Sequence, residues 1–445
     1  MQQARAGLGV AAVNGKIYAI GGSTRSGGGG TRQGPLPVTG GTVGTNEMYD
    51  PETDTWTFKT PMPTPRDHFA IATYKNKIYC IGGYISNGTA TGVNEVYDPK
   101  TDAWENKTSM PSHRTAFEAN VVGGKIYLIG GFVPNDSGFG GSRVTLNEVY
   151  DPETDSWTIA TPMPTAALDY ASTVVDNKIY FIDGFSKNPP SLLNQIYDPE
   201  TDTWSQGTPS PSSTQNGAAG ATTGVNALKR IYVLGETWNL WEDEPTYNVR
   251  VYNPANDRWI FGANIPTDRL DFGVAVVNDL LYVIGGYTAT YPDGMFSFPY
   301  GPSVTPYATN EQYTPIGYGT PDPSYDGTAP EVTVASPENK TYYTTEVVLN
   351  FIVNEPVSSM QYTLDCENAV EISDNTTLTG LSYRTHNLTV YATDAAGNMG
   401  VSETIFFTVV EEPEPFPAAP VAAASAASAA AVGVALLVYF RKRKR

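Results

Sequence analysis

Two stretches of the sequence combine aromatic side chains with carboxylates, the residue types that hold sugars and peptides. In the first stretch, three aromatic residues stand beside the acidic run Glu242-Asp243-Glu244, and the second stretch is rich in tyrosine and phenylalanine. The aromatic residues of the two stretches are Trp238, Trp241, Tyr247, Tyr291, Phe296, Phe298 and Tyr300. Flat rings stack on sugar rings, and nearby carboxylates accept hydrogen bonds. We therefore predict a binding site here; the alternative is that the rings pack on one another and hold two long loops down.

The composition argues against metal, redox and nucleic-acid functions. The chain has three histidines, His68, His113 and His386, and two cysteines, Cys80 and Cys366, without the spacing of a zinc or redox motif. We interpret the two cysteines as unpaired, and we expect no metal and no cofactor. A net charge of -19 would repel the phosphates of nucleic acid, so we expect no nucleic-acid partner.

The elements that must position the aromatic stretches are internal repeats. The sequence Asn-Glu-Val-Tyr-Asp-Pro-Glu-Thr-Asp-Ser-Trp at residues 147–157 returns, with a shortened last copy, at 46–56, 94–104, 194–204, 249–259 and 310–315. A second phrase, Lys-Ile-Tyr followed by Gly-Gly, precedes each copy. It starts at Lys16, Lys77, Lys125 and Lys178 and, in weaker form, at Arg230 and Leu281. Two phrases that each occur six times define six units of about 50 residues.

Each unit predicts four short strands. Apolar runs such as Ile126-Tyr127-Leu128-Ile129 alternate with turn sequences and leave no room for a helix. The Asp-Pro-x-Thr-Asp phrase sets a tight turn, and the tryptophan after it begins a fourth strand. On these motifs, residues 1–318 resemble a six-bladed kelch β-propeller, which is an all-β fold. The expected blades cover about 1–60, 61–108, 109–161, 162–208, 209–263 and 264–318.

Three blades depart from the repeat. Blade four has Asp183-Gly184 where Gly-Gly is expected, blade five has Gly235-Glu236, and blade six has no tryptophan after Tyr313. The segment Met1–Arg5 aligns with the interior phrases that end in arginine, so the sequence starts inside a repeat. An open third strand in blade six would invite aggregation. We therefore expect the missing fourth strand, and a signal peptide, to be encoded before Met1.

A second domain is expected after a Pro- and Gly-rich linker at 319–329. From 330 to 410 the sequence shows short strands, such as Val347–Val353 and Ser359–Leu364, separated by turns, which predicts a β-sandwich. The segment Ala392–Asn398 resembles the close of immunoglobulin-like modules in prokaryotic surface proteins. We interpret Asp394 as a turn former rather than as a calcium ligand.

The C-terminal end reads as a membrane anchor. An acidic, Pro-rich spacer (411–420) precedes an uncharged stretch (421–440) and five basic residues (441–445). Such a stretch can span a bilayer as one transmembrane helix, and a basic cluster normally marks its cytoplasmic side. We expect a single-pass protein of the cell membrane, archaeal or bacterial, with the propeller extracellular. The alternatives are a soluble Ala-rich helix and a sorting tail that is removed during anchoring.

Glycosylation sequons agree with an extracellular location, although a chain rich in Asn, Ser and Thr contains some by chance. The candidate sites are Asn87, Asn106, Asn135, Asn339, Asn375 and Asn387.

The predicted function is binding at the cell surface. In a four-stranded blade, the loops between strands two and three and the loops between blades share one face, and here these loops vary most in length. Both aromatic stretches fall on this face, in blades five and six, and blade one adds the Gly-rich loop Ser23–Thr45 beside them. We predict an adhesion or binding scaffold whose loops bind a surface glycan or a protein.

The kelch resemblance also implies other classes. Kelch copper oxidases need several copper ligands and a cross-linked cysteine, which this histidine-poor chain does not offer. Kelch sugar mutarotases use channel-facing arginine and acidic residues, so an extracellular enzyme of this type could use Asp67 or Glu118. The arginines that it could use are Arg5, Arg66, Arg114 and Arg269. Because these four recur at one repeat position, a structural role explains them more simply. A cytosolic adaptor would need a partner domain such as BTB, which this sequence does not show.

Overall fold

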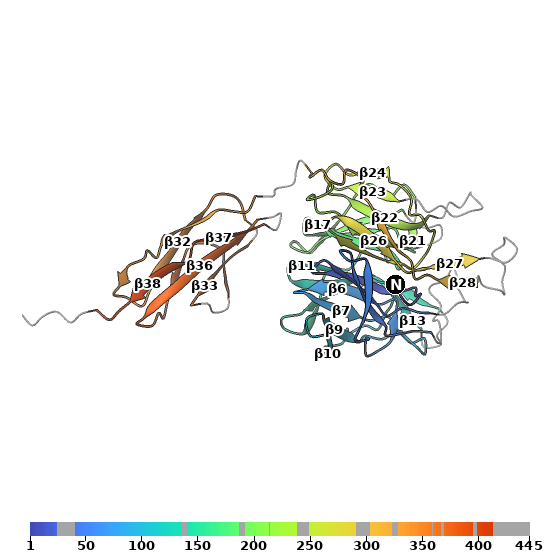
Figure 1. Cartoon of the computed structure of the whole chain (residues 1–445), viewed down its shortest axis with the longest axis horizontal. Coiled ribbons are helices and arrows are strands. Elements are labelled where there is room, and N and C mark those ends of the chain that lie inside the picture. Colours follow the sequence, from blue (N-terminus) through green and yellow to red (C-terminus); the bar gives the residue numbers. More distant parts are fainter. Residues whose placement is uncertain are drawn as a thin grey trace, which may run out of the picture. The chain divides into compact units, whose positions relative to one another are not determined.

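The computed structural model describes most of the chain. The described residues are 1–24, 41–135, 140–186, 192–212, 214–237, 249–290, 303–322, 328–357, 359–365, 369–394 and 398–412. They belong to two compact units, Met1–Tyr325 and Asp326–Arg445 (Figure 1). The regular elements of these residues are all strands.

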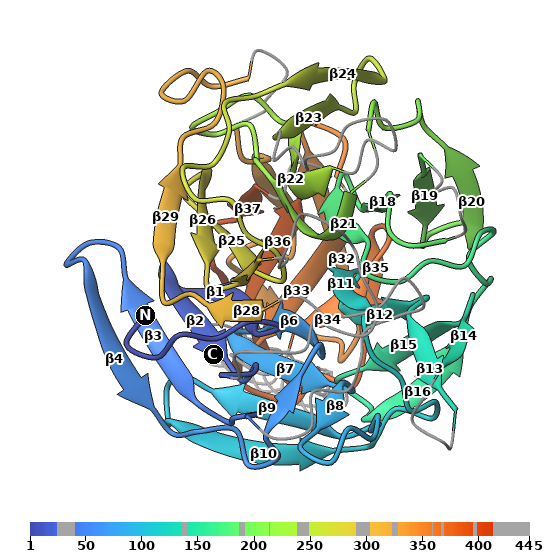
Figure 2. The ribbon, with the colours of Figure 1, turned by 90° about the vertical axis from the view of Figure 1, so that its right-hand side faces the viewer.

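The first unit is a ring of six small antiparallel sheets, or blades, around one axis (Figure 2). Blade one contains β1 (Gly9–Val13), β2 (Lys16–Ile20), β3 (Asn46–Asp50) and β4 (Thr55–Lys59). Blade two contains β6 (Ala70–Tyr74), β7 (Lys77–Ile81), β9 (Asn94–Asp98) and β10 (Ala103–Lys107). Blade three contains β11 (Glu118–Val122), β12 (Lys125–Ile129), β15 (Asn147–Asp151) and β16 (Ser156–Ile159).

The other three blades continue the ring. Blade four contains β17 (Ala171–Val175), β18 (Lys178–Ile182), β19 (Asn194–Asp198) and β20 (Thr203–Gln206). Blade five contains β21 (Thr214–Ala221), β22 (Ile231–Thr237), β23 (Arg250–Asn253) and β24 (Arg258–Phe261). Blade six contains β25 (Gly273–Val277), β26 (Leu280–Ile284) and β29 (Asn310–Tyr313), and the described residues give it no fourth strand.

Burial follows the place of each strand in its blade. The second strands are almost wholly buried, because each of their faces packs against a neighbouring blade; Ile78, Cys80 and Ile81 of β7 are fully buried. The ring closes in the same way, since Val10 and Ile17 of blade one share a core with Ala275 and Ile284 of blade six. Burial of this apolar surface is the main force that holds the blades together.

The glycine pair after each second strand is required where blades crowd. Gly83 has a φ of 90°, and a Cβ there would lie 2.6 Å from the carbonyl oxygen of Asp67. The first position of the pair is less strict, because in blade four Asp183 adopts a φ of 58°. Aspartate is one of the few residues with a side chain that enter this left-handed region readily.

In blades two to five, the turn between the third and fourth strands joins the blade to the one before it. In blade three, Asp155 Oδ1 accepts hydrogen bonds from the Tyr150 hydroxyl (2.6 Å) and from the Thr108 amide of blade two (2.8 Å). The Trp157 indole donates to the Thr108 carbonyl oxygen (3.0 Å). The same three bonds recur at three other seams. The aspartate and tryptophan that make them are Asp102 and Trp104 between blades one and two, Asp202 and Trp204 between blades three and four, and Asp257 and Trp259 between blades four and five.

The seam between blades six and one differs. Asp54 accepts the Tyr49 hydroxyl (2.8 Å), but within the described residues no amide of a preceding blade reaches it. Met1 makes the bond that Met62, Met110 and Met163 make at other seams. Its amino group donates to the Ala308 carbonyl oxygen (2.8 Å), and the amides of Gln2 and Gln3 donate to Glu47. The seam therefore depends on side-chain packing and on the first residues of the sequence.

Some segments that the sequence presented as loops are short ribbons. β27 (Tyr287–Thr290) pairs with β28 (Ser303–Pro306) inside the predicted aromatic loop of blade six. β13 (Phe132–Pro134) pairs with β14 (Gly141–Arg143), and β5 (Arg66–Asp67) pairs with β8 (Tyr84–Ile85). The connection between the second and third strands of blade six thus begins and ends in a two-stranded ribbon.

Part of the predicted linker is attached to blade five. The amide of Ile316 donates to the Tyr232 hydroxyl, and the amide of Gly319 donates to the Asn226 carbonyl oxygen. The Asp322 carboxylate accepts the Lys229 amide at 2.9 Å. The chain therefore turns back over blade five after β29, because this blade has a long connection between its first two strands that offers free backbone groups.

The second unit has two sheets that share one apolar core. The first sheet contains β30 (Val332–Ser336), β32 (Val347–Val353) and β35 (Thr376–Leu378). The second contains β31 (Thr341–Tyr342), β38 (Ile405–Val409), β36 (Thr385–Thr393), β33 (Ser359–Leu364), β34 (Val370–Ile372) and β37 (Met399–Val401). Leu349 and Phe351 of the first sheet pack with Leu388 and Phe407 of the second. The immunoglobulin-like class stays a prediction.

The membrane prediction falls on residues outside the described part of the chain. Within the described residues no helix is long and apolar enough to cross a membrane; the predicted transmembrane stretch 421–440 is not among them.

Cys80 is a buried free thiol, and burial raises its pKa to about 12. Asp394 accepts hydrogen bonds from Asn398, as a turn former does.

Candidate functional site

Backbone hydrogen bonds between blades form an arc around the axis. Five blades place the same repeat position there, in residues Gly7, His68, Ala116, Asp169 and Asp271. All five have a positive φ, between 48° and 61°. The His68 amide donates to the Gly7 carbonyl oxygen (2.9 Å), the Ala116 amide to that of His68 (3.1 Å), and the Asp169 amide to that of Ala116 (3.2 Å). The Gly7 amide donates to the Asp271 carbonyl oxygen (2.9 Å), so the backbone sets the width of this opening.

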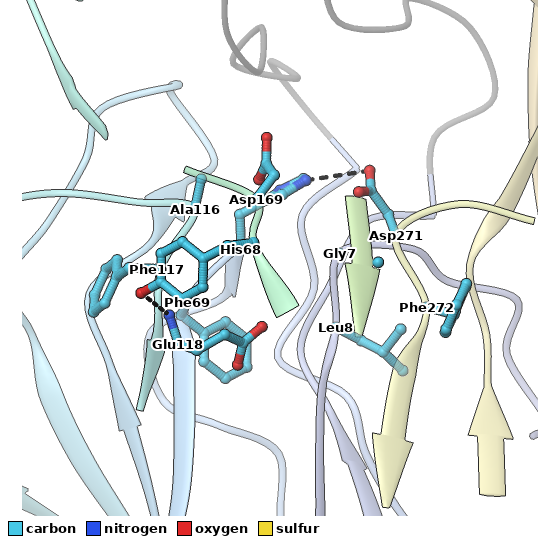
Figure 3. A pocket seen from close by; sticks show the side chains of 12 residues that line it. Gly7, Leu8, His68, Phe69, Ala116, Phe117, Glu118, Asp169, Asp271 and Phe272 are labelled. Carbon is cyan, nitrogen blue, oxygen red and sulfur yellow. Dashed lines mark hydrogen bonds and ion pairs between the residues drawn. The ribbon is translucent and has the colours of Figure 1, made fainter. Parts of the chain in front are cut away.

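A cavity of about 80 Å³ lies inside the arc. Its polar lining comes from His68, Glu118, Asp169 and Asp271, and aromatic rings form much of the remaining wall. Figure 3 shows His68, Asp169 and Asp271 grouped together, with Glu118 reaching in from β11. We call this space the axial pocket.

The axial pocket opens at the end of the ring with the variable loops. Apart from Gly217, which lies within β21, its lining residues lie at or just before the start of a first strand. Each first strand is antiparallel to its second, so that Gly9, at the start of β1, faces Ile20, at the end of β2. The connections from second to third strands therefore leave the ring at this same end.

His68 links two carboxylates, one from its own blade and one from blade six. Its Nδ1 lies 2.9 Å from Asp67 Oδ1 and its Nε2 lies 3.3 Å from Asp271 Oδ2. Burial alone would lower the pKa of His68, but the charges and hydrogen bonds of Asp271 and Asp67 outweigh it and hold the pKa well above its ordinary value. His68 is therefore a cation that donates from both ring nitrogens.

The other two acids of the pocket have raised pKa values. Burial and the charge of Asp271 raise the pKa of Asp169 to about 7, against the opposing effect of His68. Burial and the charge of Asp169 raise the pKa of Glu118 to about 8. No described residue donates a hydrogen bond to either carboxylate. Between about pH 4.5 and 8 the folded protein holds a proton on Glu118 that the unfolded chain has lost, so stability falls as the pH rises through this window.

The recurring arginines lie away from the pocket surface. Arg5, Arg66, Arg114 and Arg269 are fully buried, and each pairs with a glutamate of the third strand in its own blade. The distance is 2.9 Å for Arg5 and Glu47, 3.1 Å for Arg66 and Glu95, and 2.6 Å for Arg269 and Glu311. A ligand could contact these guanidinium groups only by opening a buried ion pair, and such opening is strongly unfavourable.

Blades four and five depart from this pairing in a coordinated way. Blade four has Gln195 at the glutamate position and Ala167 at the arginine position, so neither charge is left alone. Blade five has Arg250 at the glutamate position. This guanidinium is fully buried and reaches Asp183 of blade four at 2.6 Å. The unusual Asp183-Gly184 pair is therefore the counterpart of Arg250.

The predicted aromatic binding residues lie outside the described residues. These are Trp238, Trp241, Tyr247, Tyr291, Phe296, Phe298 and Tyr300. Their role in binding stays a prediction. Of the candidate glycosylation sites, Asn87, Asn106, Asn135, Asn339 and Asn375 are exposed and Asn387 is partly buried.

Sequence reasoning found one of the three acids that line the pocket, Glu118. It named Asp67 and Glu118 as acids that a channel enzyme could use, but it missed Asp169 and Asp271. Both stand two residues after the recurring arginine position, as His68 does. Comparison of this one repeat position across all blades would have found them. Within the described residues no group of three metal-ligating side chains is placed to hold a metal ion.

Comparison with known proteins agrees with the ring. The Attractin/LZTR1 beta-propeller family model matches residues 78–295, and the Kelch motif model matches residues 4–63. The first unit is a kelch-repeat β-propeller, and the prediction of an all-β kelch fold is confirmed.

Individual relatives match over part of the chain. The Influenza virus NS1A-binding protein homolog of Mus musculus is 42% identical over 88 residues, which is 20% of this chain and 11% of that protein. Kelch-like protein 15 of Homo sapiens is 29% identical over 167 residues, 34% of this chain and 28% of that protein. The chain thus spans about a tenth to a quarter of these relatives. The solved structure of YjhT covers 70% of this chain and 98% of its own, with a TM-score of 0.53 at 16% identity, and shows the shared fold.

Proposed function

We propose that the chain is a binding protein whose kelch propeller holds a protein or glycan ligand at the end of the ring that contains the axial pocket. The observation that carries this proposal is the lining of the pocket. Glu118 and Asp169 face the cavity, and no described residue donates a hydrogen bond to either carboxylate. Both residues are only partly buried, so a ligand in the cavity can reach them. Groups that are left unpaired at a cavity are suited to a ligand that supplies the donor.

Of the two ligand classes, a protein fits the pocket better. A cavity of about 80 Å³ is far smaller than the roughly 300–1,000 Å³ of sites that enclose a whole small molecule. It has room for the head of one side chain, while the rest of a protein ligand would lie on the loops around it. One relative with 42% identity over 88 residues is itself named for binding a protein.

The loop aromatics provide the test. We expect the joint replacement of Trp238, Trp241, Phe296 and Tyr300 by alanine to lower the affinity for a ligand found on a protein and glycan array at least tenfold, because stacked rings contribute much of such an interface. Affinity is measured by surface plasmon resonance and stability by thermal unfolding. The matched control replaces Ile159 and Phe261, which are 79% and 57% exposed on outer strands. Unchanged affinity with a large loss of stability would show that the aromatics pack the loops instead.

A second candidate is an extracellular sugar-processing enzyme of the mutarotase type. It is favoured by the pKa values of Asp169 and Glu118, about 7 and about 8, which are suitable for proton transfer near neutral pH. The same purified protein that is used on the binding array can be assayed by NMR for exchange between sugar anomers. Turnover that Glu118→Gln abolishes, without a retained ligand, would favour the enzyme.

We also propose that the propeller is displayed outside a cell membrane, on a stalk formed by the second unit and anchored through residues 421–440. The uncharged stretch and the basic residues after it support this placement. Protease added to intact cells should then remove the propeller and leave a tag after Arg445 uncut. Protection of the propeller in intact cells, with cleavage after lysis, would contradict the proposed topology.

A further inference from the structure

We propose that the axial pocket binds a single protonated amine, such as a lysine side chain of a protein ligand. This rests on the proposed function and names the chemical group that the pocket selects.

The charges of the pocket are unbalanced. Asp67 and Asp271 share the cation of His68, at 2.9 and 3.3 Å. From blades three and four, Glu118 and Asp169 add two further carboxyl groups, and Gly7 and Gly217 add no charge from blades one and five. Ionised Glu118 therefore has no counter-ion among the described residues, and ionised Asp169 has only the His68 cation that Asp67 and Asp271 already share, so the pKa values of both acids are raised. A cation in the cavity would supply the missing positive charge and stabilise the ionised form of both acids.

A buried hydroxyl outside the lining of the pocket also lacks a partner among the described residues. Tyr84 is 2% exposed, and its hydroxyl oxygen has no hydrogen-bond partner among the described residues. In the ribbon of β5 and β8 it lies opposite Asp67. Burial, followed by the charges of Asp169 and Asp67, raises its pKa, so the ring lies within the field of both acids. An ammonium group has three donors, and the carboxyl groups of Asp169 and Glu118 offer acceptors for them in the cavity.

The size and walls of the pocket favour an ammonium group over other ions. The rings of Phe69, Phe117 and Phe272 line it, and ring faces attract cations. An anion would meet the carboxylates. A guanidinium is planar and larger, whereas an ammonium is a compact charge on a thin stem, which suits a cavity of about 80 Å³.

Three small probes test the inference on the full chain at pH 7.5: acetyl-lysine methylamide, its arginine analogue and its uncharged norleucine analogue. Isothermal titration calorimetry should show that the lysine probe binds at least tenfold more tightly than the norleucine probe. In buffers of different ionisation enthalpy, the binding should release protons, because the cation favours ionised Asp169 and Glu118. Equal binding of the lysine and norleucine probes, or the absence of proton release, would overturn the inference.

Variants locate the binding. Glu118→Gln and Asp169→Asn should each lower the affinity for the lysine probe at least tenfold. Glu200→Gln, at an exposed turn, is the control and should change nothing. Glu118→Gln should also be more stable than the natural protein as the pH rises from about 4.5 to 8, so a loss of binding cannot be attributed to unfolding. Pocket variants with unchanged affinity would overturn the inference. A protein ligand that binds at the loops without a preference for lysine would overturn it too, yet leave the proposed function standing.

Discussion

Replacement of Arg250 by methionine is expected to lower the free energy of unfolding of the propeller by about 3–5 kcal/mol, because a buried carboxylate then loses its cation. Arg250 and Asp183 are both fully buried and lie 2.6 Å apart. The double variant Arg250→Met with Asp183→Gly should recover at least half of this loss, since it removes both charges and restores the glycine of the other blades. The measurement is urea unfolding followed by tryptophan fluorescence, to which all seven tryptophans contribute from the first unit.

The control for this experiment is a surface pair of equal length. Lys178 and Asp198 also lie 2.6 Å apart, but their side chains are 47% and 23% exposed. Lys178→Met should cost no more than about 1 kcal/mol. Two results would contradict a stabilising role for the Arg250–Asp183 pair. Either Arg250→Met and Lys178→Met lower the free energy of unfolding equally, or the double variant is less stable than Arg250→Met alone.

Replacement of Asp155 by alanine is expected to cost about 1.5–3 kcal/mol more than the same change at Asp54, the usual contribution of a hydrogen bond to a charged group. Asp155 accepts the amide of Thr108 across a seam at 2.8 Å, whereas Asp54 has no such bond within the described residues. Both keep the bond to their own tyrosine. Their φ angles are 50° and 52°, so the strain of alanine in the left-handed region cancels in the comparison.

The pH adds a second check on Asp155. Burial alone would raise its pKa, but the hydrogen bonds from Tyr150 and Thr108 outweigh it and leave the pKa below the ordinary 3.8. The stabilisation by Asp155 is therefore present above about pH 4 and is lost as the pH falls through the lowered pKa. The two alanine variants should converge in stability below that range. A difference between them that persists in acid, or that is absent at pH 7, would contradict the assigned role of the seam bond.

The strands of the propeller could be predicted from the sequence because each blade is a local unit. The phrases around Lys125 and Asn147 carry their own turns and their own apolar alternation, and β12 and β15 start at these residues. The axial pocket could not be predicted in this way. His68 and Asp271 are 203 positions apart, and they meet because the ring closes, which no single repeat encodes.

The departures of blades four and five from the repeat are explained by one contact. Asp183 stands where the other blades have the first glycine of the pair, and Arg250 stands where they have glutamate or glutamine. Each of the two residues is explained only by the other, because their side chains form an ion pair between blade four and blade five. Two departures from a repeat in neighbouring units can thus balance each other's charge. Such departures should therefore be compared in pairs.

The arc of backbone hydrogen bonds at the axis has a consequence for how such a protein changes over evolutionary time. Its bonds run from amide to carbonyl, so the identity of the side chains at Gly7, His68, Ala116, Asp169 and Asp271 does not decide whether the arc forms. A left-handed backbone still favours glycine, asparagine, aspartate and histidine over bulkier residues. Selection can therefore exchange neutral, acidic and imidazole groups at these positions one at a time, and acquire a new ligand preference without first having to rebuild the scaffold.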